Sequence, residues 1–84
     1  MSMSAIQREI SNIAYNLWNN GETMTISELS EELESRGFNP GNGRGLYKQI
    51  STTYSRAVEE NNQGVADCIA NCFTTDDGRY AWAD

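Results

Sequence analysis

Two helix starts, each in the form of a capping box, constrain the fold of this chain more than any other feature. In this motif a Ser or Thr side chain and a Glu or Gln side chain three residues later satisfy two free backbone amides. Ser4 and Gln7 have this spacing. Apolar residues then recur at helical intervals, and they are Ile6, Ile10, Ile13, Ala14, Leu17 and Trp18. Gly21 is suited to a left-handed cap, so we expect a helix over about residues 4–19.

The second capping box is formed by Thr25 and Glu28. A narrower apolar seam follows it, made of Ile26, Leu29 and Leu33. Residues 23–25, which lead into this segment, are compatible with a very short strand. The pattern predicts a second helix over about residues 26–36, with its glutamates facing water.

A third helix is expected over about residues 44–60, after a turn-forming cluster at 39–43. Its apolar side consists of Leu46, Tyr47, Ile50, Tyr54, Ala57 and Val58. Its opposite side is polar, and it carries Arg44, Lys48, Ser51, Thr52 and Ser55, with Gln49 and Arg56 at the flanks. Residues 36–58 hold no acid, although the net charge of the chain is −6. This basic stretch favours contact with an anionic partner, and chance segregation of charge on a solvated surface is the competing interpretation.

The last twenty residues allow two interpretations. Val65, Cys68, Ile69, Cys72 and Phe73 fit one side of a helix, whereas the Asp77-Gly78 dipeptide is typical of a strand turning in a hairpin. We favour a short helix over about 65–72 and then a small β-hairpin over about 73–83, which pairs 73–75 with 79–82. The expected fold is then one mainly α domain, a three-helix bundle with a short fourth helix and a C-terminal hairpin, spanning residues 1–84.

This order of elements resembles a winged helix-turn-helix domain over nearly the whole chain. In that resemblance, residues 24–33 are the step from the first strand to the second helix, and residues 45–54 are the recognition helix. Residues 75–79 are the wing. Small single-domain proteins of this kind are also similar to ones found in phages and prophages.

The resemblance implies a small DNA-binding or accessory protein of transcription regulation, whose third helix enters the major groove. Lys48, Ser51, Thr52 and Ser55 would then reach base edges. Arg44 and Arg56 would hold phosphates, and Arg79 would sit on the wing. A homodimer would double the number of cations that contact the DNA.

The acidity of the chain supports an alternative function. The net charge is −6, and Asp76 and Asp77 on the expected wing would repel phosphate. The alternative is a protein-interaction module, an adaptor or inhibitor that uses its acidic faces, such as Glu31 and Glu32, and that binds no nucleic acid.

Several classes of protein are not expected. The chain has no histidine, which removes Ser-His-Asp and Cys-His catalysis, and no other catalytic signature is present, so we expect neither an enzyme nor a cofactor. Cys68 and Cys72 could supply only half of a zinc site, and we expect them to be buried free thiols rather than metal ligands. Two cysteines are too few for a disulfide framework, which favours a reducing cytoplasm. The sequence shows neither a signal peptide nor an apolar run approaching the roughly 18 residues of a membrane span.

Aromatic residues supply most of the large apolar area of the chain. In a chain this small they usually form the core, and those concerned are Trp18, Tyr47, Tyr54, Phe73, Tyr80 and Trp82. Tyr80 and Trp82, if exposed together, would instead mark a contact patch.

Overall fold

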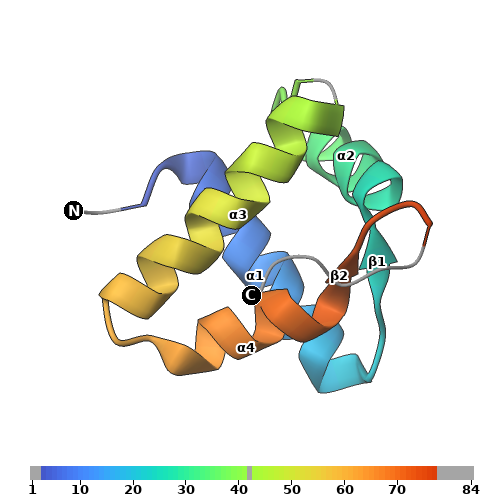
Figure 1. The fold of residues 1–84 in the computed structure, drawn as a ribbon. Coiled ribbons are helices and arrows are strands. Elements are labelled where there is room, and N and C mark those ends of the chain that lie inside the picture. The colour runs from blue at the N-terminus through green and yellow to red at the C-terminus, as the bar shows by residue number, and fades with distance from the viewer. Residues whose placement is uncertain (1–2, 42, 78–84) are drawn as a thin grey trace.

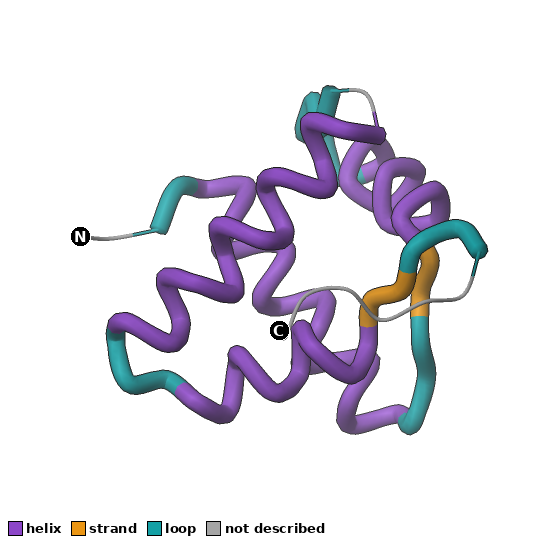
Figure 2. The backbone as a smooth tube through the Cα atoms, in the orientation of Figure 1, coloured by secondary structure: helices purple, strands orange, loops and turns teal. Residues whose placement is uncertain are grey.

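The computed structural model describes residues 3–41 and 43–77, and it is mainly helical (Figures 1 and 2). The elements in chain order are α1 (Ala5–Asn20), β1 (Met24–Thr25), α2 (Ile26–Ser35), α3 (Gly43–Glu59), α4 (Gln63–Cys72) and β2 (Phe73–Thr74). The expected mainly α fold and its short fourth helix are therefore confirmed. None of the described helices combines the length and the apolar character that crossing a bilayer requires.

Both capping boxes are present in the structure. Ser4 accepts a hydrogen bond from the Gln7 backbone amide at 3.4 Å, and its own amide donates to Gln7 Oε1 at 3.0 Å. Thr25 and Glu28 make the same reciprocal pair at 3.2 and 3.0 Å. Gly21 ends α1 in the left-handed conformation, with φ of 66°, which costs glycine no steric strain. Local hydrogen bonding thus determines where these two helices begin.

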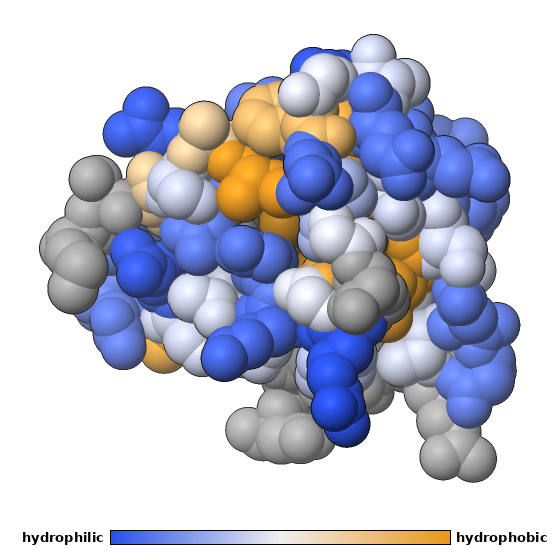
Figure 3. All heavy atoms as spheres, turned by 90° about the horizontal axis from the view of Figure 1, so that it is seen from above, coloured by the Kyte–Doolittle hydropathy of each residue, from blue (hydrophilic) through white to orange (hydrophobic). Residues whose placement is uncertain are grey.

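The helices enclose one apolar core. α1 lies behind α3 and α4 in Figure 1 and contacts both of them, while α2 packs against α3. Fully buried side chains come from every helix, and they include Ile10, Leu29, Leu33, Leu46, Ile50 and Ile69. Each such side chain stabilises the fold by about 1.5–3 kcal/mol relative to its exposed state. Seen from above, hydrophobic side chains reach the surface mainly in one area in the upper middle of Figure 3, and hydrophilic side chains cover most of the rest of this face.

The strand at Phe73–Thr74 has a partner that the sequence did not suggest. Met24 lies opposite Phe73 and Thr25 opposite Thr74, so β1 and β2 form a two-stranded parallel sheet. The two strands run side by side at the right of Figure 1. A hairpin between 73–75 and 79–82 was expected, but its second strand falls outside the described residues. The parallel pairing depends on the packing of α4 against α1, which no local sequence pattern encodes.

Three expectations about burial are wrong, and one residue that carried no expectation is buried. Trp18, Tyr47 and Val58 are substantially exposed, with Trp18 at 51%, whereas Thr53 is fully buried. α3 contacts its neighbours through a narrow stripe, and Tyr47 and Val58 lie at the edges of that stripe. Thr53 tolerates burial because its hydroxyl donates to the backbone carbonyl of Gln49 at 2.7 Å. Tyr80 and Trp82 lie outside the described residues.

Candidate nucleic-acid interface

The side chains that we expected to contact DNA lie on the side of α3 that faces away from the core. The buried residues of the helix are Leu46, Ile50, Thr53 and Ala57, which recur at intervals of three and four and hold one side of the helix inward. Among the expected site residues, Arg44, Lys48 and Ser55 are exposed, and Ser51, Thr52 and Arg56 are half-buried. Arg79 lies outside the described residues.

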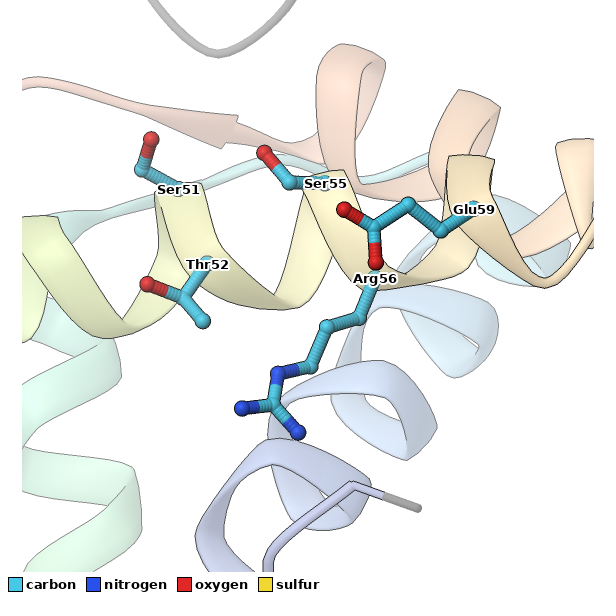
Figure 4. Close-up of a pocket in the computed structure, with 5 residues that line it drawn as sticks. All are labelled: Ser51, Thr52, Ser55, Arg56 and Glu59. Atoms are coloured by element: carbon cyan, nitrogen blue, oxygen red, sulfur yellow. The ribbon is translucent and has the colours of Figure 1, made fainter. Parts of the chain in front are cut away.

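Four of the expected site residues share one shallow hollow along α3. Its lining is Ser51, Thr52, Ser55, Arg56 and Glu59, and its volume is about 340 Å³. Figure 4 shows Ser51 and Ser55 extending from one edge of the helix, and Thr52 and Arg56 extending from the opposite edge. The lining of the hollow therefore consists of hydroxyl groups, a guanidinium and a carboxylate.

Glu59 is the residue of this hollow that sequence reasoning missed. It lies four residues after Ser55 and three after Arg56, so helical spacing within the expected helix could have placed it there. Its carboxylate lowers the positive potential at the end of α3. The positive character of the helix is therefore strongest toward Arg44 and Lys48.

Arg44, Lys48, Thr52 and Arg56 recur at every fourth residue and form one row along α3. The row spans roughly 18 Å at a rise of 1.5 Å per residue. Neither Arg44 nor Lys48 forms an ion pair with any acid in the part of the chain that the structure describes. The first half of α3 thus presents two exposed cations to solvent.

Arg36, another base of the acid-free stretch, is engaged within the fold. Its Nε lies 2.7 Å from Glu32 Oε2, and its Nη1 pairs with Glu9. The hydrogen bonds to Glu32 and then to Glu9 raise the pKa of Arg36. The guanidinium links α1 to α2 instead of contributing to the exposed face of α3.

Asp76, on the expected wing, is also engaged within the fold. The backbone amide of Ser27 donates to Asp76 Oδ1 at 3.0 Å, and the Ser27 hydroxyl donates to Oδ2 at 2.7 Å. The side-chain and backbone hydrogen bonds from Ser27 lower the pKa of Asp76. A carboxylate at the positive end of α2 is electrostatically favourable. Asp76 therefore connects the segment after β2 to the start of α2.

The two cysteines lie in α4 and are both buried free thiols. Burial raises the pKa of Cys68 and of Cys72, which keeps both sulfurs in the neutral form that binds metals poorly. Within the described residues there is no group of three or more Cys, Asp or Glu side chains arranged to hold a metal ion.

Comparison with models of protein families, with curated proteins and with solved structures finds no match to this chain. The function has to be inferred from the residues and geometry of the chain itself.

Proposed function

We propose that this protein is a small DNA-binding or accessory regulatory protein that places α3 in the major groove. Lys48, Ser51, Thr52 and Ser55 would face base edges, while Arg44 and Arg56 would contact phosphates. Arg79 belongs to the same proposal as a wing residue. Short hydroxyl side chains suit this role because they both donate and accept hydrogen bonds without filling the groove.

The observation that carries the proposal is the polar side of α3, where Arg44 and Lys48 are exposed and form no ion pair with an acid of the described residues. α3 has 17 residues, which corresponds to a length of roughly 25 Å. A helix with its side chains is about 10–12 Å wide, close to the roughly 12 Å width of the major groove. Arg44 and Lys48 lie at the exposed start of this helix, where its backbone dipole also favours an anion.

The order of the elements supports a winged-helix-like arrangement. A helix, a short strand and two further helices follow one another, as that architecture implies, and the short strand β1 pairs with β2 near the C-terminal side. The chain departs from it in two places. α4 intervenes between α3 and β2, and the connection at 36–42 is longer than the roughly three or four residues of a compact helix-turn-helix.

The test is a titration of the protein with duplex DNA at two salt concentrations. Contacts from Arg44, Lys48 and Arg56 would give a slope of about −2.7 for log K against log salt, so affinity should fall about fortyfold between 50 and 200 mM salt. Lys48→Glu should weaken binding strongly and reduce the slope by about 1. Absence of any binding at 50 mM salt would refute the proposal.

Arg8→Glu provides the matched control. Arg8 is exposed on α1, and its reversal changes the net charge by the same amount as Lys48→Glu. Because Arg8 is not on α3, the slope should stay unchanged in this variant. Equal losses of affinity in the two variants would indicate a general effect of net charge and would count against an interface on α3.

A second candidate function is a protein-interaction module, and the acidic outer side of α2 favours it. Glu28, Glu31 and Glu34 are exposed there. Glu31→Lys is the informative variant, because Glu32 and Asp76 both make contacts within the fold and their reversal would destabilise it. This function would be established by two results together. A basic partner binds the wild-type chain but not Glu31→Lys, and the chain does not bind DNA.

A further inference from the structure

The exposed aromatic side chains of α1 form a second surface, separate from α3. Tyr15 is 56% exposed and Trp18 is 51% exposed, and they lie three residues apart on the same side of the helix. Large aromatic side chains left in solvent often mark a place where another molecule binds.

These aromatic residues border a groove between α1 and α4. Its volume is about 340 Å³, and the side chains that matter here are Tyr15, Trp18, Val65, Asp67 and Cys68. Cys68 is 5% exposed, and burial keeps its thiol neutral. The groove therefore has aromatic and apolar walls with a carboxylate at its edge.

Trp18 also borders a neighbouring hollow of about 280 Å³, which carries Glu22 and Cys72. The indole thus lies between two depressions, each with one acidic residue. No basic residue lines either of them in the part of the chain that the structure describes. The local charge around Trp18 is negative.

One oxygen of the Asp67 carboxylate accepts a hydrogen bond within α4. Gln63 Nε2 donates to Asp67 Oδ1 at 2.9 Å, and Asn71 Nδ2 donates to the backbone carbonyl of Asp67 at 2.8 Å. Oδ2 has no hydrogen-bond partner among the described residues. Asp67 therefore offers a carboxylate oxygen as an acceptor in the same groove that Trp18 lines.

We propose that the α1–α4 groove binds an arginine-bearing segment of a protein partner. A guanidinium can stack on an indole face and at the same time donate to a carboxylate, which matches Trp18 and Asp67. Lysine fits less well because its ammonium is a strongly hydrated point charge without a planar face.

The charge of the chain distinguishes between occupants of the groove. An anionic segment would be repelled by Asp67 and Glu22, and a second copy would bring its own net charge of −6. A cationic partner is favoured by both the local and the overall charge. This proposal goes beyond DNA binding and involves different helices, so it does not depend on whether α3 binds DNA.

The experiment uses the full chain, labelled with ¹⁵N, and three capped peptides of the same length. One peptide carries two arginines in a glycine background, one carries two citrullines, and one carries two glutamates. The Trp18 indole N–H signal and the α4 amides should shift with the arginine peptide. Citrulline, which is neutral and nearly isosteric, should bind at least about fivefold more weakly.

Three variants at two positions test the named residues. Trp18→Ala should weaken binding of the arginine peptide about fivefold to thirtyfold, and Trp18→Phe should retain part of it. Asp67→Asn should weaken it, since the amide can still accept from Gln63 but carries no charge. Glu60→Gln removes an exposed acid that lines neither hollow, so it is the matched control and should leave binding unchanged.

Three results would overturn the proposal. Equal binding of the arginine and citrulline peptides would show that charge is not recognised. Preference for the glutamate peptide would show that the groove binds an anionic partner and not a cationic one. Self-association that rises with protein concentration and is abolished by Trp18→Ala would show that a second copy occupies the groove.

Discussion

Phe73 is the position at which α4, β2 and the core meet, and its truncation should strongly destabilise the protein. The residue is fully buried, its backbone amide donates to the carbonyl of Ile69 at the end of α4, and it lies opposite Met24 in the sheet. Phe→Ala in a core costs about 3–5 kcal/mol through lost transfer energy and a residual cavity. At roughly 0.05–0.15 kcal/mol per residue, the total stability of an 84-residue chain is about 4–13 kcal/mol. Phe73→Ala should therefore remove a quarter or more of the stability and can unfold the protein.

Urea denaturation followed by circular dichroism measures this loss. Phe73→Leu keeps most of the side-chain volume, so it should lower the free energy of unfolding by less than about half as much as Phe73→Ala. Tyr15→Ala is the control, because it truncates an aromatic side chain that is 56% exposed, and it should cost less than about 1 kcal/mol. A loss below about 1 kcal/mol for Phe73→Ala, equal to that of the control, would refute the placement of Phe73 in the core.

Three further predictions concern polar groups and thiols. Asp76→Asn should lower the melting temperature at neutral pH, because its carboxylate accepts two hydrogen bonds from Ser27. Those bonds lower the pKa of Asp76 below its ordinary 3.8. The difference in melting temperature between variant and wild type should therefore be complete above pH 3.8 and disappear as the pH falls through the lowered pKa. A difference in melting temperature that persists in acid would contradict the hydrogen bonding of this carboxylate to Ser27. Arg36→Gln removes two partly exposed ion pairs and should lower the free energy of unfolding by about 1 kcal/mol at low salt. Because salt screens ion pairs, thermal melts in about 1 M salt should show a smaller loss of stability. Cys68 and Cys72 are buried, and their pKa values are raised. Ellman's reagent at pH 8 should therefore modify both thiols far more slowly in the native protein than in urea. Equal rates of modification would contradict the burial of the two thiols.

The helices were predictable because the signals that define them are local. A capping box joins residues three apart, and an apolar stripe repeats within a turn or two, so neither depends on the rest of the fold. The expected starts near 4, 26 and 44 lie within one residue of those observed. The choice of helix over strand for 65–72 also proved right, since the three-and-four spacing of its apolar residues is a helical period.

Part of the candidate interface was predictable for the same reason. Helical periodicity alone separates Arg44, Lys48 and Ser55 from the buried side of α3, and it would have placed Glu59 beside Arg56. It could not show that Arg36 is engaged by Glu9, because those residues lie on different helices. Which cations remain available to a partner is therefore decided by the packing of the helices.

By itself, the sequence determined where the helices begin and which side of each one is apolar, since both depend on hydrogen bonds and spacings within a few residues. Only the tertiary structure decided how wide each buried stripe is and what covers it, which left Trp18 exposed and Thr53 buried. The pairing of β1 with β2 and the hydrogen bonds between Ser27 and Asp76 also belong to the tertiary structure. These contacts join segments about fifty residues apart, and they form only when packing of the helices brings both segments together.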